Sequence, residues 1–372
     1  MKVLEVKNVG PIKHAKVEFG DLTILVGPQA SGKSVFLQML KLAVDEASIA
    51  FNLQELGGRW NGDVKAFMSV YLGEGADSYW GPSSLVISDG NRLLLPPSIH
   101  EQHRRPLGRM VYIPAQRVMA FTLDGWPRPS SEFLKGDPYV LKAFGSSQRS
   151  QLEDMFSLRN TSEPPVMSLV RSTIVPGFSL QIDRRTPFSR LILEQDDGES
   201  RLPFNVWSAG QRESIPLVVG ITEVFSGLDL VDWLAVEEPE MGLHPQGIAA
   251  VMSLIFHVLT KEVSVCISTH SVHVLDIVWA LRVLSEQQAP PEALLKMLRL
   301  DKTPDLIKMA ATVLEKKVSA YFFDRESGKT RDISRLDPSG KGEAESGWGG
   351  LTEWSARVGD AVADAVAAAR AK

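Results

Sequence analysis

Several short runs of apolar residues, each followed by a turn of polar or small residues, divide the chain. Because almost every position in these runs is apolar, each run predicts a strand that is buried on both faces of a sheet. The runs are Leu22–Val26, Met110–Ile113, Asp232–Val236 and the stretch 263–267. Strands of this kind occur mainly in sheets covered by helices on both sides, so the predicted fold class is α/β.

The beginning of the chain follows a different pattern. Residues 1–19 alternate polar and apolar positions, which predicts two β-strands joined by a turn at Asn8–Pro11. After the first buried run, apolar residues recur with helical spacing at Val35, Leu37, Leu40, Leu42 and Ala43. We therefore expect a mixed central sheet with N-terminal antiparallel strands and a long helix that starts near residue 33.

The regions between these runs predict a multi-part organisation. Residues 1–120 and 204–280 carry the buried runs and are expected to form one core, with an insertion at about 46–109. Residues 121–203 mix proline-rich turns, short helices and a hairpin, so we expect an inserted, mostly helical lobe. Residues 281–372 are expected to be a C-terminal extension. Within it we predict two strands around Ser327–Gly328 and a final amphipathic helix, which packs on its own core or docks a partner.

Composition narrows the class of protein. The chain has 372 residues, a formal charge of −5 and a single cysteine, Cys266, so it cannot form an internal disulfide. This suits a cytoplasmic location. No apolar run reaches the roughly 18 residues of a membrane helix, and the first residues lack the apolar centre of a secretion signal, so we expect no membrane contact.

The net charge gives no general reason to expect nucleic acid, which stays open as a ligand through a local basic patch. The cluster His100–Arg109 fits either a phosphate-backbone contact or a solvated face.

The residues Gly27–Ser34, GPQASGKS, match the pattern G-x-x-x-x-G-K-[ST] between a predicted strand and a predicted helix. In this context the glycines let backbone N–H groups face phosphates, and the helix N-terminus adds partial positive charge. Lys33 is expected to reach the β- and γ-phosphates, and the Ser34 hydroxyl to ligate Mg²⁺. The candidate nucleotide-binding residues are Gly27, Gln29, Ser31, Gly32, Lys33 and Ser34. ATP and Mg²⁺ are the expected cofactors.

Two later strand ends carry groups that suit phosphate chemistry. Asp232–Val236 leads into Glu237, Glu238 and Glu240. A carboxylate at this position beside a P-loop holds Mg²⁺ through water, so Glu237 is the candidate metal residue, and Glu238 is the candidate general base. The alternative is a solvated acidic loop. The strand at 263–267 ends near His270, whose alternative role is that of an ordinary loop histidine.

Residues 207–214, WSAGQRES, raise a separate question, because a second small-residue turn runs into a helix far from the P-loop. Taken alone, it predicts a helix N-cap at Ser208, with a helix at roughly Glu213–Phe225. Taken in order, the P-loop, this turn, the acidic strand end and the histidine strand end resemble the ABC-type ATPase fold. That resemblance covers about residues 1–275 and implies a P-loop NTPase with an ABC-type head.

The resemblance assigns further roles. Ser208, Gly210 and Gln211 match the ABC signature loop, which in that family crosses a head-to-tail dimer and caps the γ-phosphate held by the partner. Gln116 resembles the Q-loop glutamine that senses Mg²⁺ and the γ-phosphate, and Arg117 is a candidate to share that role. His270 matches the switch histidine, and Met241–His244 stands at the D-loop position. A homodimer or higher homo-oligomer is implied.

Two departures point to a narrower group. Glu237 stands where most ABC proteins have aspartate, and His244 where the D-loop often has aspartate. This stretch resembles the RecF/OLD-like ATPases, often labelled AAA-15 or AAA-21. Long heptads are absent, so no coiled-coil arm is expected. Asp324 and Glu326 are the acids that suggest a nuclease, but no full constellation accompanies them, so we expect no TOPRIM nuclease domain.

The resemblance therefore implies an ATPase similar to the ATPase subunits of bacterial anti-phage systems such as PARIS or Septu. Such a subunit controls a separate effector, a nuclease or a toxin. The alternatives are a RecF-like DNA-maintenance ATPase, which binds DNA in an ATP-dependent way, and a transporter ATPase. The large insertions argue against the transporter.

Overall fold

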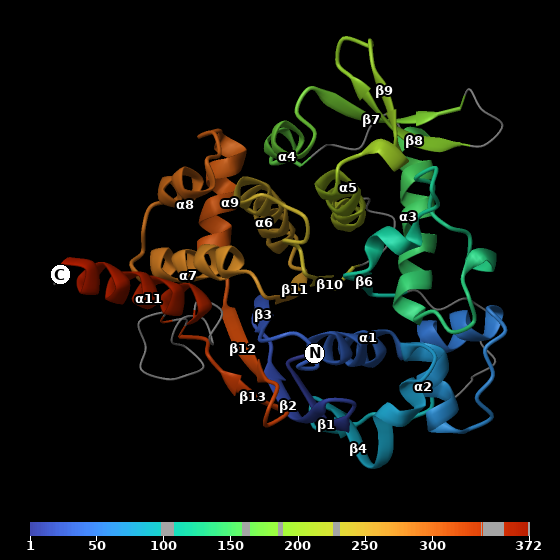
Figure 1. Ribbon diagram of the computed structural model, residues 1–372. Coiled ribbons are helices and arrows are strands. Elements are labelled where there is room, and N and C mark those ends of the chain that lie inside the picture. Colours follow the sequence, from blue (N-terminus) through green and yellow to red (C-terminus); the bar gives the residue numbers. More distant parts are fainter. Residues whose placement is uncertain are drawn as a thin grey trace.

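The computed structural model describes residues 1–97, 108–157, 164–184, 189–225, 231–335, 337 and 353–370. Residues His100, His103, Arg104 and Arg105 of the basic cluster lie outside these ranges. A ten-stranded sheet forms the centre, in the order β5-β4-β1-β2-β13-β12-β3-β11-β10-β6 (Figure 1). Its strands are β1 Val3–Val9, β2 Ile12–Glu18, β3 Leu22–Val26, β4 Trp80–Ser88, β5 Asn91–Arg92, β6 Met110–Ile113, β10 Trp233–Glu237, β11 Ser264–Thr269, β12 Val318–Asp324 and β13 Lys329–Asp332.

The sheet is mixed, as its sequence pattern predicts. Strands β6, β10, β11, β3 and β12 run parallel, and the four predicted buried runs form four of them. Strands β1 and β2 pair antiparallel, with a turn in which Asn8 and Gly10 adopt left-handed backbone angles. Strand β4 extends this antiparallel part on the other side of β1. The α/β class with N-terminal antiparallel strands is therefore confirmed.

Helices cover both faces of the sheet. They are α1 Lys33–Glu55, α2 Val64–Leu72, α3 Tyr139–Ser157, α4 Met167–Ile174, α5 Ala209–Thr222, α6 Pro245–Leu259, α7 Val272–Glu286, α8 Pro291–Leu298, α9 Pro304–Leu314 and α11 Glu353–Arg370. Short 3₁₀ turns are η1 Ala76–Tyr79, η2 Arg117–Ala120, η3 Ser130–Glu132, η4 Phe204–Val206 and η5 Glu223–Phe225. Figure 1 shows the sheet curving around α1, with β3, β11 and β10 on one side of that helix and β1 and β4 on the other.

Side chains on the two faces of the parallel strands pack into two separate hydrophobic cores. On β10, Leu234 and Val236 join the core under α5, α6 and α7, whereas Trp233 and Ala235 join the core around α1 and α2. Successive side chains of a strand point to opposite faces, so an all-apolar run fills both cores at once. This double burial fixes the strand register, because a slip by one residue would exchange the two faces.

The lobe at residues 121–203 contains helix and sheet. Helices α3 and α4 precede a three-stranded antiparallel sheet of β7 Phe178–Asp183, β8 Arg190–Gln195 and β9 Arg201–Pro203. The expected hairpin is β7–β8, and β9 adds a third strand. This small sheet packs its apolar side into the same core as α5 and α6, since Leu191 and Leu193 are both buried there.

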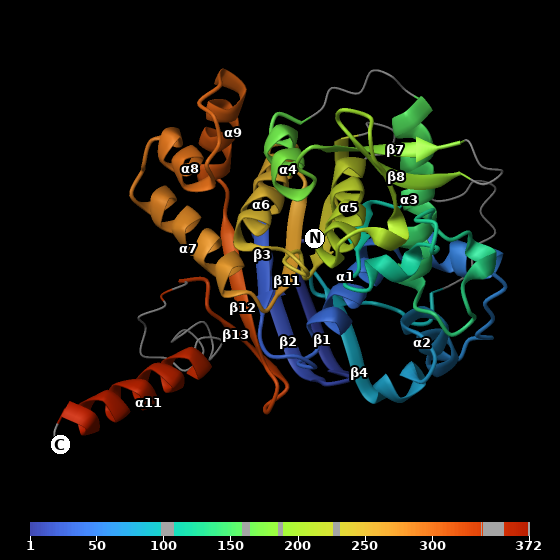
Figure 2. The ribbon, with the colours of Figure 1, turned by 45° about the horizontal axis from the view of Figure 1, so that its top comes forward.

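The segment after residue 281 contributes to the central sheet. Strands β12 and β13 form the expected pair around Ser327–Gly328, and β12 also pairs in parallel with the P-loop strand β3. The final helix α11 lies apart from the sheet in Figure 2. Its valines Val358, Val362 and Val366 are 44–58% exposed, so this apolar stripe does not pack on the core. Among the described helices, none combines the length and apolar character needed to cross a bilayer.

Candidate nucleotide-binding site

The candidate residues, apart from those at Ser208–Gln211, gather at one edge of the parallel sheet. Strands β3, β11, β10 and β6 are neighbours and run in the same direction, so their carboxyl ends meet at a common edge. The P-loop follows β3, His270 follows β11, the acid pair ends β10 and Gln116 follows β6. Ligands of open α/β sheets bind at this edge, outside the carboxyl ends of the strands.

The P-loop takes a conformation that only small residues permit. Gly27 and Gly32 have φ values of 148° and 99°. A Cβ at Gly27 would lie 2.4 Å from the carbonyl oxygen of Phe323 on β12, and one at Gly32 would lie 2.6 Å from Ile12. Both glycines are therefore required by left-handed geometry and by close neighbours. Helix α1 begins at Lys33 with no side-chain cap, so its first N–H groups remain available to a ligand.

Lys33 is buried inside this loop. Its ammonium donates hydrogen bonds to the carbonyl oxygens of Gly27 and Pro28 at 2.7 and 2.8 Å. Burial lowers the pKa of Lys33 to about 8, and the nearby carboxylates of Glu238, Glu240 and Glu237 oppose that shift. A buried cation that relies on neutral carbonyl oxygens would be stabilised further by an anion.

A cavity of about 420 Å³ lies over the loop. It is lined by Pro11, Gln29–Val35, Tyr79, Glu238 and His270. Volumes of this size are typical of small-molecule sites. The P-loop residues and the catalytic candidates therefore share one hollow.

Glu237 is buried and held by three donors. It accepts hydrogen bonds from the Tyr112 hydroxyl, the Ser34 hydroxyl at 3.1 Å and the Ala115 N–H at 3.4 Å. Burial raises the pKa of Glu237, and these donors act against that rise. Tyr112 was not identified from sequence; its place on β6, beside β10, brings its hydroxyl to the acid.

The donor set fits Mg²⁺. Ser34 and Glu237 offer hard oxygen ligands at one point, and Mg²⁺ usually takes one or two protein oxygens, with phosphates and water completing its shell. No group of three or more His, Cys, Asp or Glu side chains suited to a metal occurs in the described part of the chain. Gln116 is exposed at the turn after β6, and no hydrogen bond joins its amide to Ser34 or Glu237 among the described contacts. The structure thus brings two of the three predicted metal residues together.

Glu238 and His270 are in direct contact on the wall of the cavity. Glu238 has a left-handed φ of 46°, unusual for a residue with a side chain, and its N–H donates to the carbonyl oxygen of Ser268 at 2.8 Å. Its Oε1 lies 2.5 Å from His270 Nε2. This hydrogen bond lowers the pKa of Glu238 and raises the pKa of His270. In this state the candidate base is paired with the candidate switch residue.

Glu240, the third glutamate, orients the histidine strand end. Its Oε1 accepts hydrogen bonds from the Thr269 hydroxyl at 2.7 Å and from the His270 N–H at 2.9 Å. The sequence showed Glu240 only as part of an acidic loop. Its position two residues after Glu238, on a turn that lies beside β11, gives it this supporting contact.

The signature-like loop, Ser208–Gln211, lies at a different hollow. Helix α5 starts at Ala209, so the expectation of a helix from about Glu213 is wrong. The reason is a reciprocal capping box, in which Ser208 Oγ accepts from the Gln211 N–H and the Gln211 side chain accepts from the Ser208 N–H. The expected N-cap at Ser208 is therefore present.

The signature-like loop, like the P-loop, packs so closely on a neighbouring turn that a glycine is needed. A Cβ at Gly210 would lie 2.7 Å from the carbonyl oxygen of Gly242, so the loop packs directly on the turn Met241–His244. A cavity of about 270 Å³ adjoins both, lined by residues that include Ser208, Gly210, Gln211 and His244. It shares no lining residue with the cavity over the P-loop. Within one chain, the structure does not bring the signature-like loop to the P-loop.

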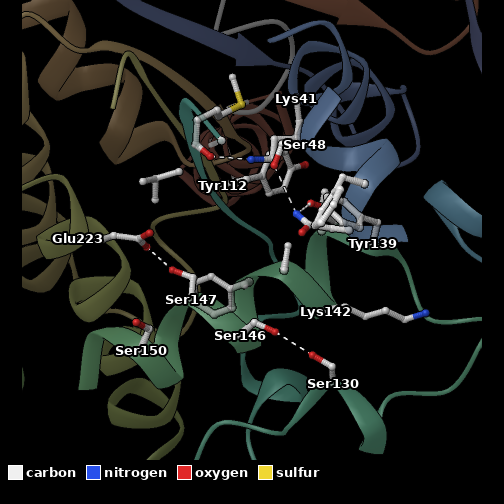
Figure 3. Close-up of a pocket in the computed structure, with 18 of the residues that line it drawn as sticks. Lys41, Ser48, Tyr112, Ser130, Tyr139, Lys142, Ser146, Ser147, Ser150 and Glu223 are labelled. Atoms are coloured by element: carbon white, nitrogen blue, oxygen red, sulfur yellow. Dashed lines mark hydrogen bonds between the residues drawn. The ribbon is translucent and has the colours of Figure 1, made fainter. Parts of the chain in front are cut away.

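A larger cavity of about 730 Å³ lies elsewhere, between α1, α3 and β6 (Figure 3). Its walls include Lys41, Asn52, Tyr139, Gln151 and several serines. Tyr112 belongs to this wall too, while its hydroxyl bonds Glu237. One tyrosine thus links the two regions.

Comparisons with known proteins give a distant relative. The chain is 24% identical over 325 residues to the OLD nuclease of Thermus scotoductus (strain ATCC 700910 / SA-01), a match that covers 74% of this chain and 60% of the relative. The chain therefore spans less than two thirds of that protein. No protein-family model matches the chain.

Solved structures with a similar arrangement share little sequence. An SMC head bound to the C-winged helix domain of ScpA aligns with a TM-score of 0.39 and 13% identity, over 89% of this chain and 96% of that one. The ATP-binding subunit of an ABC transporter aligns with a TM-score of 0.35 and 13% identity, over 90% of this chain and 91% of that one. Scores at this level add no argument to the geometry described above.

Proposed function

We propose that the chain binds ATP with Mg²⁺, hydrolyses it, and uses the cycle as a switch in a head-to-tail dimer. The carrying observation is that the P-loop and the Glu238–His270 pair line one cavity at the ends of three neighbouring strands, and that Glu237 contacts Ser34 of the same loop. Helix N-termini, buried lysines and paired acids are the groups that phosphoryl transfer needs.

Each residue has a distinct part in the proposed reaction. The free N–H groups of the P-loop and the Lys33 ammonium hold the β- and γ-phosphates. Ser34 and Glu237 hold Mg²⁺, which neutralises phosphate charge when bound. Glu238 accepts a proton from the attacking water, once its carboxylate leaves His270. His270, released from Glu238, is then free to donate to the γ-phosphate.

The proposal of a dimer is supported by the separate cavity beside the signature-like loop. The signature-like loop presents the N-terminus of α5 but faces no phosphate site of its own chain. Its Ala209 and Gly210 N–H groups and the Ser208 hydroxyl proton are the donors left by the capping box. In the proposed dimer these donors meet the γ-phosphate of the partner subunit, and each chain completes the site of the other.

We further propose that the switch controls a separate nuclease or toxin in antiviral defence. The setting in antiviral defence rests on the resemblance given above, and two observations bear on the effector. The relative is named an OLD nuclease, which suggests a nuclease as the effector. In this chain Asp324 caps a turn, accepting from the Glu326 and Ser327 N–H groups and pairing with Arg331, so it is engaged in structure.

The deciding experiment compares the wild type with Glu238→Gln by ATP turnover and by mass photometry, with and without ATP and Mg²⁺. We expect turnover to fall by about 100-fold or more, because a general base contributes roughly 10²–10⁴. We also expect an ATP-dependent dimer to accumulate. Glu286→Gln, which removes an exposed ion pair with Arg282, is the matched control and should behave as wild type. Unchanged turnover and a size that ignores nucleotide would refute the assignment.

A second measurement separates effector control from DNA maintenance. The purified chain is incubated with plasmid and single-stranded DNA, with and without ATP. The proposal expects no cleavage and no ATP-dependent retention of DNA. Tight ATP-dependent binding would favour the RecF-like alternative.

A further inference from the structure

Arg117 is the largest fully buried side chain among the described residues. Removing a guanidinium from water is unfavourable unless its donors are satisfied, so its burial requires a dedicated set of acceptors. Four backbone carbonyl oxygens supply that set. They belong to Pro114, Glu213, Glu237 and Glu238.

These acceptors come from three separate elements. Arg117 Nε donates to the Glu213 oxygen at 2.9 Å, on the second turn of α5. Nη1 donates to the Glu237 oxygen at 3.0 Å, and Nη2 to the Glu238 oxygen at 3.1 Å. One rigid, planar group therefore ties the helix behind the signature-like loop to the backbone of the candidate metal residue Glu237 and of the candidate base Glu238.

The contact to Glu238 bears on catalysis because that residue is strained. A left-handed φ is unfavourable in a residue with a side chain and persists only when its surroundings hold it. The hydrogen bonds with Ser268 and Arg117 hold the N–H and the C=O of Glu238, one on each side of its Cα. Moving Arg117 would therefore re-aim the Glu238 carboxylate.

Glu213, the contact of Arg117 on α5, lies close to the signature-like loop and to the turn on which that loop packs. Gly210 packs on Gly242 with no room for a Cβ, and a Cβ at Gly242 would lie 3.4 Å from Glu213 Cγ. The Glu213 carboxylate adds a weak ion pair, since its Oε2 lies 3.4 Å from Arg117 Nε but makes no hydrogen bond. A shift of the start of α5 thus reaches Arg117 through close-packed backbone.

We propose that Arg117 is a positioning residue that couples the signature-like loop of a chain to the orientation of Glu238 in the same chain. When the partner's phosphate engages Ser208–Gln211, α5 moves, and the guanidinium carries that movement to the acid pair. The inference rests on the proposed dimeric ATPase and specifies its regulation: each subunit hydrolyses its own ATP only after its signature-like loop has engaged the nucleotide of the other.

The test uses Arg117→Lys, which keeps the charge but replaces the planar fork by a single ammonium. Three quantities are measured as protein concentration rises: ATP affinity, dimer fraction and turnover per subunit. In the wild type, turnover per subunit should rise as the dimer forms. In the variant we expect the same ATP affinity and the same dimer, but turnover that stays flat and about 10- to 100-fold lower, from loss of one or two charge-assisted hydrogen bonds.

Two further proteins make the result decisive. Arg190→Lys changes an arginine of the small sheet that pairs with Asp183, and it should keep the wild-type rise. Glu213→Gln keeps the side-chain volume and the backbone carbonyl acceptor. It is the variant to use if Arg117→Lys has a lowered melting temperature. We expect it to reduce the dimer-linked turnover several-fold with unchanged ATP affinity.

The outcomes are distinguishable. If the wild type shows no ATP-dependent dimer and no turnover, the proposed function fails, and this inference fails with it. If the wild type behaves as proposed but both variants retain its dimer-linked rise, Arg117 is only structural and the coupling is wrong. A loss of ATP affinity parallel to the loss of turnover would also overturn the inference, since it would indicate general damage to the site.

Discussion

The P-loop and the signature-like loop are both turns that lead into a helix N-terminus, yet only the second of these helices has a side-chain cap. At the P-loop, Gly32 leaves α1 uncapped, and Lys33 bonds its own loop carbonyls. At the signature-like loop, Ser208 and Gln211 cap α5 reciprocally. An uncapped helix start is built to be completed by a ligand, whereas a capped one is already stable without it. The P-loop thus has free donors for a ligand of its own chain. The signature-like loop is stable by itself, and in the proposed dimer it contacts a phosphate of the partner subunit.

The largest effect should come from removing the cation of the first loop. Lys33→Ala is expected to weaken ATP binding by about 100-fold or more, because several charge-assisted hydrogen bonds to phosphate are lost together. Isothermal titration calorimetry measures the change. Lys16→Ala, an exposed lysine on β2, is the control and should bind as wild type. Equal affinity in both variants would show that the P-loop does not hold phosphate.

The second loop can be tested without damaging its helix cap. Asp and Asn are both good N-cap residues, so Ser208→Asp and Ser208→Asn should change the free energy of unfolding by less than about 0.5 kcal/mol. Only Ser208→Asp places a negative charge against the partner's phosphate. We expect it to reduce the ATP-dependent dimer and turnover by about 30-fold, with ATP affinity intact. The contrast with Ser208→Asn is the measurement, by mass photometry and phosphate release. Matching losses in both would leave the loop as a cap alone.

The smallest effect concerns protons. Burial places the pKa of Lys33 at about 8, so below that pH the ligand-free lysine is charged and above it increasingly neutral. Bound phosphate favours the charged form, so ATP binding should take up protons, and affinity should fall, as the pH rises past about 8. Calorimetry in buffers of different ionisation enthalpy detects the uptake. Lys33→Arg should remove it, since arginine stays protonated. The signature-like loop has no ionisable side chain, so at saturating ATP the dimer step should not share this dependence.

Local patterns predicted much of this site, and non-local contacts supplied the rest. The P-loop and the acid pair could be located because each lies on one strand–turn unit whose residue order shows its geometry. Tyr112 could not, because an apolar strand gives no sign that its tyrosine hydroxyl will meet an acid on the neighbouring strand. Glu240 was visible but had no assigned role, and Arg117 was assigned only a share in the Q-loop role, since their contacts lie on β11 and α5. Sequence spacing does not state which strands become neighbours.

The position of the P-loop strand has a consequence for the order in which the molecule is made. Strand β3 comprises Leu22–Val26, but its neighbours in the sheet are β11 at Ser264–Thr269 and β12 at Val318–Asp324. A ribosome that has released only the first half of the chain has therefore released the phosphate loop without either strand that supports it. Such long-range pairing is slow and leaves apolar edges exposed meanwhile. We expect nascent chains to need protection until residue 324 has emerged, and ATP to bind only to chains that have passed that point.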